Sequence, residues 1–174
     1  MNMKNLKFVA LLTMFVFGSV MTFAQDIAHI DFNKVYDAMP EYKKAESDYE
    51  ALGNKHKTEI EKQEAALKAL YEQAQKDLAG KSQEEVQKYV TEKKLQEQEQ
   101  ALQQKLQTYR EAAQKEMVEK EKSLFEPIYT KVNTAVSAAA KKKNLKYVLP
   151  ANMVIYSDGG YDLFNDVKAE LGIK

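Results

Sequence analysis

The stretch from residue 40 to 122 limits most strongly how this chain can fold, because it consists mostly of Ala, Glu, Lys, Gln and Leu. All five favour helix. The larger side chains recur at alternating steps of three and four, which is the heptad spacing of a coiled coil. Pro40 suits the first helical turn, where its missing N–H would be unpaired anyway. The seam of this first helix comprises Tyr42, Ala45, Tyr49, Leu52, His56, Ile60, Gln63, Leu67, Leu70, Ala74 and Leu78.

A turn signal divides this stretch near residues 79–82. Gly80 tolerates left-handed backbone and can end a helix, and Ser82 with Glu85 forms an S-x-x-E capping box that starts a new one. The two helices are therefore predicted to form a long antiparallel coiled-coil hairpin with its tip at this point. The seam of the returning helix comprises Val86, Val90, Leu95, Leu102, Leu106, Tyr109, Ala113, Met117 and Leu124.

The predicted hairpin has a thin contact seam. Polar residues, His56 and Gln63, occupy seam positions, and Gly53 lies within the helix at a cost of about 1 kcal/mol relative to Ala. We therefore expect arms that keep their helical structure without a rigid tertiary position. A turn centred near residue 80 predicts as opposing pairs Tyr71 with Tyr89, Leu70 with Val90, Ala74 with Val86, Leu52 with Tyr109 and Tyr42 with Val118.

The segments on either side of the hairpin predict a small α/β body. Residues 26–32 have the pattern of a short strand, with Ile30 and Phe32 on one face, and Asn33 is a good N-cap for the short helix that follows. Pro127 removes a helical hydrogen bond, so a kink or break is expected there.

The C-terminal part of the body is predicted to contain two strands and a helix. The runs 146–149 and 152–157 are rich in β-branched and aromatic residues, and each is followed by a turn signal. Asp162 can cap the last helix, which Gly172 closes. The fold class is thus mainly α with a small β body, in which a hairpin of residues 40–123 is inserted into a three-strand α/β body of residues 25–39 and 124–174.

Such a small body is marginal as a self-sufficient core, and its strand edges are open to pairing. We therefore expect the sheets to associate across subunits. The residues expected to build this association body are Ile27, Ile30, Phe32, Val148, Met153, Val154, Ile155 and Tyr156.

The first 24 residues have the layout of a cleaved secretory signal peptide. Lys4 and Lys7 precede an apolar run from Phe8 to Val20, and Thr22-Phe23-Ala24 places small residues before a cut at Gln25. The apolar run is shorter than the roughly 20 residues of a spanning helix. These features predict export, which in a diderm bacterium means the periplasm, where no ATP pool can drive the function.

Charge and composition exclude several classes of function. The chain has 26 basic and 26 acidic residues, and loss of the leader with its two lysines leaves 24 against 26, a net charge of −2. That balance argues against a globally basic nucleic-acid binder. The chain has no Cys, and its two histidines, His29 and His56, lack partners at ligand spacing, so we expect no metal, no cofactor and no catalytic site.

The order and spacing of these pieces resemble the Skp/OmpH family of periplasmic chaperones. The resemblance rests on the leader, Ile27-Ala28-His29-Ile30-Asp31-Phe32, Val35, Pro40-Glu41-Tyr42-Lys43-Lys44-Ala45, the charged hairpin, Leu124-Phe125-Glu126-Pro127-Ile128, Tyr147-Val148-Leu149 and Asn152-Met153-Val154-Ile155-Tyr156. It implies a homotrimer with a shared β-barrel-like body and three hairpins around a central cavity. It also implies holding of unfolded outer-membrane β-barrel precursors.

On this interpretation the client-binding surface lies near the tip of the arm. Its candidate residues are Leu67, Leu70, Tyr71, Leu78, Val86, Tyr89 and Val90. The best-known members of the family are strongly basic, whereas this mature chain is near neutral, so no lipopolysaccharide site is transferred and client attraction should depend more on apolar contacts than on net charge.

Two alternatives remain open from the sequence. The same heptads suit a structural or scaffolding coiled-coil protein of the cell envelope. Separately, Lys141, Lys142, Lys143 and Lys146 form a basic cluster that suits either weak contact with anionic envelope lipids or simple capping of a helix C-terminus.

Overall fold

The computed structural model describes residues 27–156 and 158–173. The expected signal peptide, residues 1–24, lies outside them. In chain order the elements are β1 (Ile27–Ile30), α2 (Phe32–Asp37), α3 (Pro40–Leu78), α4 (Gln83–Glu92), α5 (Leu95–Lys142), β2 (Tyr147–Pro150), a 3₁₀ turn (Ala151–Met153), β3 (Tyr161–Asp162) and α6 (Phe164–Leu171).

The chain divides into two compact units. One is the hairpin from Pro40 to Tyr129, and the other combines the residues before Pro40 with those from Thr130 onward. Helix α5 contributes to both units and continues through Pro127. The break expected at Pro127 is therefore absent, because the loss of one N–H leaves the hydrogen bonds of the turns on either side in place.

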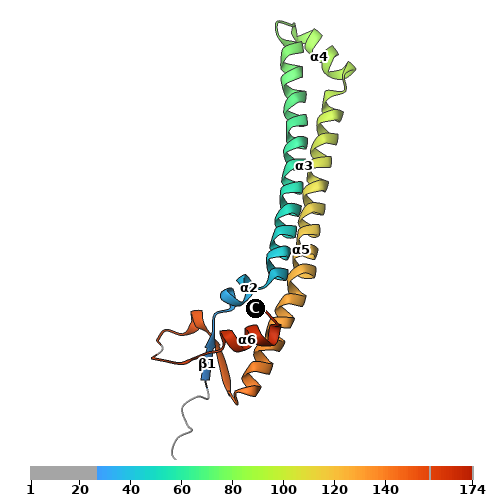
Figure 1. Ribbon diagram of the computed structural model, residues 1–174. Coiled ribbons are helices and arrows are strands. Elements are labelled where there is room, and N and C mark those ends of the chain that lie inside the picture. Colours follow the sequence, from blue (N-terminus) through green and yellow to red (C-terminus); the bar gives the residue numbers. More distant parts are fainter. Residues whose placement is uncertain (1–26, 157, 174) are drawn as a thin grey trace, which may run out of the picture. The chain divides into compact units, whose positions relative to one another are not determined.

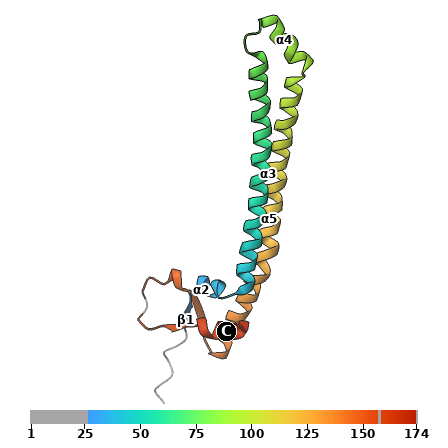
Figure 2. The same cartoon turned by 45° about the horizontal axis from the view of Figure 1, so that its top comes forward.

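The hairpin is formed by α3 and α5, which run side by side in opposite directions (Figures 1 and 2). Near its base, the ring of Phe125 packs edge-on against those of Tyr42 and Tyr49, with centroids 5.5 and 6.0 Å apart. Every predicted seam residue of both helices is buried or half-buried. The heptad reading of the sequence is thus confirmed, and α3 begins at Pro40 as predicted.

The tip is larger than the sequence indicated. The capping box of Ser82 with Glu85 is present and Gly80 has a left-handed backbone with φ of 76°, both as predicted. The returning helix, however, is not continuous, because it breaks between α4 and α5 at Lys93 and Lys94, where Lys94 has φ of 51°. Residues 79–94 together make the turn.

This wider turn shifts the pairing between the arms. Tyr71 hydrogen-bonds to Glu99, ten residues beyond the predicted Tyr89, and Tyr42 packs on Phe125, seven residues beyond the predicted Val118. The partners predicted for Tyr71 and Tyr42 are therefore wrong. Val118 is 60% exposed on α5. The pairing moved because the turn is centred within α4 and not at Gly80.

The other unit contains a three-stranded parallel sheet in the order β2-β1-β3. Ile27 of β1 lies opposite Tyr147 of β2, and Ala28 lies opposite Tyr161 of β3. The inward side chains of β1, Ala28 and Ile30, are fully buried. They share this unit's core with Val35, Met39, Val132, Leu163 and Val167, none of which is more than 1% exposed.

The three-strand prediction is confirmed in number, but its third strand is wrong. Residues 152–157 were expected to form it, whereas the chain turns in a 3₁₀ helix at Ala151–Met153 and the third strand is Tyr161–Asp162. Pro150 lacks the N–H that would continue the ladder. The N–H of Val154 instead closes the turn by donating to the carbonyl of Ala151 at 3.2 Å.

The ends of the short helices follow local hydrogen bonding. The N-cap of α2 is Asp31 and not the expected Asn33, because the Asp31 carboxylate accepts from the N–H groups of Asn33 and Lys34. Phe32 accordingly lies in α2, not in the first strand. At the other end of the chain, Asp162 accepts from Phe164 N–H at 2.9 Å, and Gly172 closes α6 with φ of 69°, as predicted.

Candidate functional site

The apolar residues proposed to contact clients lie at the outer end of the hairpin, in the last turns of α3 and in α4. Tyr71 is 46% exposed, the other six candidates are half-buried, and α4 buries no side chain fully. The tip therefore offers apolar side chains that are neither sequestered in a core nor freely solvated. Surface of this kind favours contact with other apolar chains.

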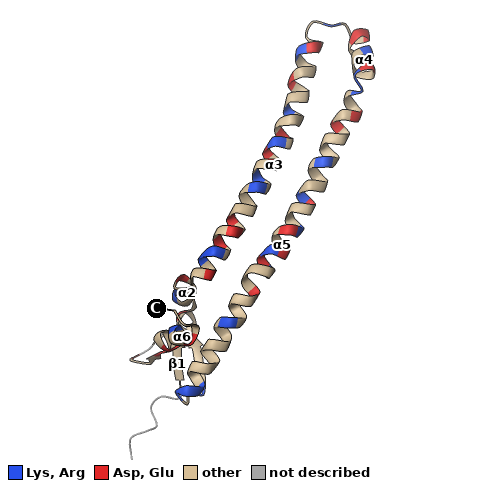
Figure 3. Ribbon diagram, turned by 45° about the vertical axis from the view of Figure 1, so that its right-hand side comes forward, with Lys and Arg blue, Asp and Glu red and all other residues tan. Residues whose placement is uncertain are grey.

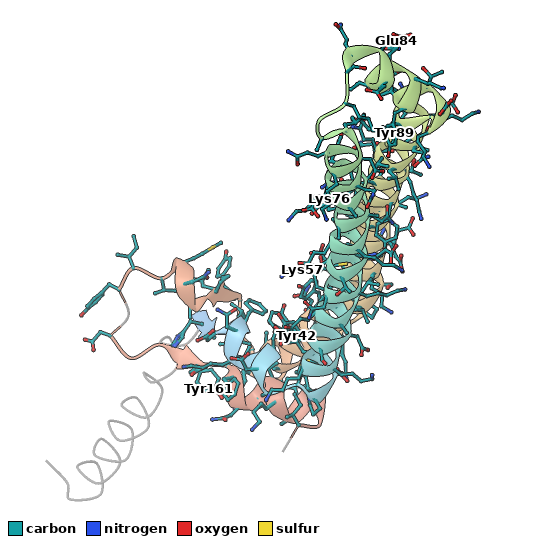
Figure 4. The ribbon with its side chains drawn as sticks, turned by 90° about the horizontal axis from the view of Figure 1, so that it is seen from above. Tyr42, Lys57, Lys76, Glu84, Tyr89 and Tyr161 are labelled. Carbon is teal, nitrogen blue, oxygen red and sulfur yellow. The ribbon has the colours of Figure 1, made fainter. Side chains whose placement is uncertain are left out.

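Two tyrosines near the tip donate hydrogen bonds to carboxylates. Tyr71 in α3 donates to Glu99 in α5. Tyr89 in α4, which is labelled in Figure 4, donates to Asp77 at the end of α3. These bonds raise the pKa of both phenols above their ordinary value of 10.0, with the carboxylate as the leading cause. The bond from Tyr89 is likewise the leading cause of a lowered Asp77 pKa.

The middle of the hairpin contains a polar layer within the seam. His56 is only 6% exposed, and its Nδ1 lies 2.9 Å from the hydroxyl of Tyr109. Its Nε2 lies 3.4 Å from a carboxylate oxygen of Glu116, without hydrogen-bond geometry. Gln63, also buried, donates to Glu59 at 3.0 Å while its own oxygen has no partner. Buried polar groups left partly unsatisfied reduce the stability of a seam.

His56 had been interpreted as a polar residue of the seam with no metal-binding role, and the structure places it there. Its partner Tyr109 was not predicted, because the expected register put Tyr109 opposite Leu52. Across the described part of the chain, no group of three or more His, Cys, Asp or Glu side chains is arranged to hold a metal ion. His29, the other histidine, is half-buried in β1.

Charges of both signs alternate along both arms (Figure 3). Several of them form pairs one turn apart on the same helix, such as Lys44 with Asp48 at 3.1 Å. The Arg110–Glu64 pair instead joins α5 to α3. The arm surface is therefore locally balanced in charge and carries no field of one sign. Further one-turn pairs on the arm are Lys57–Glu61, Lys62–Glu59, Lys68–Glu72, Lys88–Glu92, Lys94–Glu97 and Lys115–Glu119.

The residues expected to mediate association fall into three groups by exposure. Ile30 is fully buried inside its own unit and supports the sheet from within. Ile27, Met153, Ile155 and Tyr156 are exposed by 53%, 75%, 103% and 81%, which is high for such large apolar side chains. The remaining three, Phe32, Val148 and Val154, are half-buried.

The sequence reasoning missed two further residues of this surface. Tyr147 and Leu149 are 63% and 42% exposed on β2, which pairs with β1 alone and so has a free edge. Their alternation in a four-residue strand was a signal available from the sequence. We call the exposed set Ile27, Tyr147, Leu149, Met153, Ile155 and Tyr156 the body patch.

The basic cluster after α5 is largely paired within the chain. Lys142 pairs with Glu170, and Lys143 lies 3.1 Å from Asp166 and over the ring of Tyr161. Hydrogen bonds that Lys143 donates to Tyr161 and Asp166 raise the pKa of Lys143. These contacts fasten the end of α5 to β3 and α6, and they leave less of the cluster for lipids. No helix in the described residues is long and apolar enough to cross a membrane.

Comparison with known proteins agrees with this architecture. Residues 26–171 match the family model described as outer membrane protein (OmpH-like). An uncharacterised protein of Aquifex aeolicus (strain VF5) is 32% identical over 165 residues, covering 95% of each chain. A crystal structure of a candidate outer membrane chaperone (OmpH-like) from Caulobacter crescentus CB15 superposes with a TM-score of 0.65 at 14% identity, covering 86% of this chain and 85% of that one. The chain therefore belongs to the family of OmpH-like outer membrane proteins.

Proposed function

We propose that the protein is a periplasmic chaperone that holds unfolded outer-membrane β-barrel proteins without ATP and prevents their aggregation. Family membership supports the chaperone class, and the similar Caulobacter protein is itself described as a candidate outer membrane chaperone. The observation that carries the proposal is the hairpin tip, whose apolar side chains are half-covered and carried on a thin, partly polar seam.

The mechanism follows from many small contacts. A chain that binds unfolded clients lowers the concentration of free unfolded protein by mass action and so slows aggregation. Half-exposed Leu, Val and Tyr side chains contact apolar segments of any sequence, and Tyr adds a hydrogen-bonding hydroxyl. Because the arm charges are balanced, these apolar contacts supply most of the affinity. Holding a client in this way needs no catalytic residue, which fits a protein that is not an enzyme.

The body patch supports a homotrimer. Six large apolar side chains exposed on one small unit, with a free strand edge among them, favour burial against another copy of the chain. Three hairpins carried by a shared body would enclose a cavity in which clients are held.

The direct test is suppression of aggregation. A urea-unfolded β-barrel protein is diluted into buffer with the mature protein and without ATP, and light scattering is followed. We expect suppression at stoichiometric trimer. A variant with Leu78, Val86 and Val90 changed to Gln should suppress severalfold less, whereas three Gln substitutions at the exposed Lys68, Lys76 and Lys88 should not. No suppression by the wild-type protein at a severalfold excess of trimer contradicts the proposal.

A second candidate is a scaffolding coiled coil of the envelope, favoured by the continuous heptad seam. It predicts recovery of one folded partner and no unfolded clients in pull-down experiments. A contribution from lipids would appear as liposome flotation that depends on the basic cluster Lys141, Lys142, Lys143 and Lys146.

A further inference from the structure

Helix α4 is bounded on both sides by residues with left-handed backbone. Gly80 has φ of 76° in the link from α3, and Lys94 has φ of 51° in the link to α5. Left-handed backbone interrupts helical hydrogen bonding, so each link separates α4 from the neighbouring long helix. Within these links α4 has its own capping box and is a complete ten-residue helix.

One side-chain hydrogen bond connects α4 to the rest of the hairpin. Among the described residues, Tyr89 is the α4 side chain that bonds to another helix, and its acceptor is Asp77 of α3. The other polar contacts of α4 are local: Lys88 pairs with Glu92, and Thr91 donates to the carbonyl of Gln87. No α4 side chain is fully buried, but Val86, Tyr89 and Val90 are half-buried, so the Tyr89 hydrogen bond acts together with partial apolar packing.

Asp77 is held in place as an acceptor. It accepts from Gln73 at 2.9 Å as well as from Tyr89, and the charges of Lys93 and Lys81, one on each link, act on it. The residues around Asp77 therefore come from α3, from α4 and from both links. The Asp77 carboxylate therefore holds α4 in its observed position against the end of α3.

We propose that α4 is a flap that turns on the links at Gly80 and Lys94, that the Tyr89–Asp77 hydrogen bond keeps it closed, and that opening uncovers Leu78, Val86 and Val90. This builds on the proposed holding function and names its regulation. An extended apolar segment of an unfolded client binds the uncovered side chains and keeps the flap open, which shifts the equilibrium by its higher affinity for the open state.

The flap is tested without any client. The chain has no Cys, so spin labels at Gln75→Cys and Lys88→Cys report the distance between α3 and α4. Tyr89→Phe removes only the hydroxyl, and Tyr71→Phe is the matched control, because it removes an equivalent Tyr–carboxylate bond between α3 and α5. We expect Tyr89→Phe to broaden the distance distribution and to speed amide exchange in α4 about three- to tenfold. Identical behaviour in all three proteins overturns the flap.

The link to client holding is tested on the same cysteine pair. A bismaleimide cross-linker of the length measured in the closed state locks the flap, and we expect capture of a urea-unfolded β-barrel protein to slow severalfold relative to each single-cysteine protein treated in the same way. Unchanged capture overturns the regulatory role even if the flap moves. If the uncross-linked protein fails to hold clients at all, the proposed function fails, and the spin-label result still decides whether the flap exists.

Discussion

At the scale of single residues, the two glycines of the hairpin have opposite requirements. Gly53 is helical and has room for a methyl group, since a Cβ there would lie 3.7 Å from Met117 Cε, an ordinary contact. Gly80 also has open space around it, but its φ of 76° strains any side chain. One glycine is thus a removable defect in the helix, and the other is needed by the turn.

Alanine substitutions should separate these roles. Gly53→Ala should stabilise the hairpin by about 1 kcal/mol through helix propensity. Gly80→Ala should destabilise it by about 1–2 kcal/mol, because L-residues pay that amount for left-handed backbone. Thermal unfolding followed by circular dichroism measures both. Equal shifts in the same direction would contradict the assignment of Gly80 to a left-handed turn.

The carboxylates of the tip give the flap a defined pH window. The Tyr89 hydrogen bond is the chief reason that the pKa of Asp77 is lowered from 3.8. The stability that this bond gives to the closed flap is therefore complete above pH 3.8 and is lost as the pH falls below that value. The same bond raises the pKa of Tyr89 from 10.0. The stability that the bond gives to the closed flap is therefore also complete below pH 10.0 and is lost as the pH rises above that value. The capping box lowers the pKa of Glu85 from 4.5. The stability that this box gives to α4 is therefore also lost as the pH falls below 4.5, and together with the loss at Asp77 it sets the acid limit of the flap.

We therefore expect protection of the α4 amides to be constant between about pH 5 and 9 once intrinsic exchange is corrected. It should fall under more acidic conditions. Tyr89→Phe should remove the Asp77 part of this acid dependence and leave the part that belongs to Glu85. Hydrogen exchange measured across this range, with an amide in the middle of α3 as the internal reference, provides the comparison. An acid limit unchanged in Tyr89→Phe would contradict the assigned role of Asp77.

At the scale of elements, the arm combines stable helices with a poorly filled seam. The helices are supported by their composition and by many one-turn ion pairs, each of small effect. The seam between them includes the buried polar side chains His56 and Gln63, where a coiled coil would ordinarily place large apolar ones. The compliance that we expect of the arm would thus come from the contact between α3 and α5 and not from either helix.

Filling this seam should stiffen the arm. Replacing His56, Tyr109 and Gln63 by Leu, Phe and Leu removes the buried polar atoms together with their partner hydroxyl, and we expect a gain of at least about 1 kcal/mol in hairpin stability. If compliance serves clients of different size, the same variant should suppress aggregation less well. Unfolding midpoints and the aggregation assay, measured together, test this, and a stiffer arm with unaltered holding would show that compliance is dispensable.

The elements also show which parts of the fold could be predicted from the sequence. Every residue that the heptad spacing placed in the seam is buried or half-buried, because burial on a long helix follows from the helical period, but Phe125, which packs on Tyr42 and Tyr49, was not among them. The pairing across the hairpin was missed, because it depends on the break at Lys93 and Lys94, two ordinary lysines with no turn signal. The third strand was missed because Tyr161–Asp162 has only two residues, whereas the Val154-Ile155-Tyr156 run has strand composition but follows Pro150.

For the candidate site, the sequence supplied the residue types but not their contacts. The apolar residues of the tip were recognisable from their spacing. The tyrosine–carboxylate hydrogen bonds were not recognisable, because they depend on the register between the helices. These bonds join Tyr89 to Asp77 and Tyr71 to Glu99. In the body patch, Tyr147 and Leu149 were placed in a strand, but their exposure follows from β2 being an edge strand, which is a property of the whole sheet.

At the scale of the whole molecule, the two units are expected to divide the work, with association in the body and holding in the arm. The exposed fraction of Ile155, 103%, identifies it as a side chain without cover in a single chain. A charge introduced there should disrupt contact between copies and leave each chain folded.

Association is tested by sedimentation of the mature protein. Ile155→Asp, alone and with Tyr147→Asp, should shift the protein from trimer toward monomer, whereas Val118→Asp, a matched change at an exposed apolar residue of the arm, should not. Circular dichroism checks that helix content is retained. Trimers that persist in the double variant would exclude the body patch as the interface.

Holding is tested by shortening the arm. Deleting residues 65–109 and joining the ends through a short Gly-rich turn removes the tip but keeps Glu64 and Arg110, which face each other across the hairpin. We expect the shortened protein to sediment as the full-length one does and to lose most of its suppression of aggregation. Sedimentation as a monomer would show that the arms contribute to association.

The sheet order β2-β1-β3 has a consequence for timing. Strand β1 is made first, but both of its neighbours, at residues 147–150 and 161–162, lie beyond the entire hairpin. The local contacts of α3 and α5 can therefore form while β1 is still unpaired. The sheet can be completed only after nearly the last residue has been synthesised. A nascent chain can thus form the hairpin well before the sheet of the proposed association body is complete, so we expect a product truncated before residue 147 to keep the hairpin and to fail to associate.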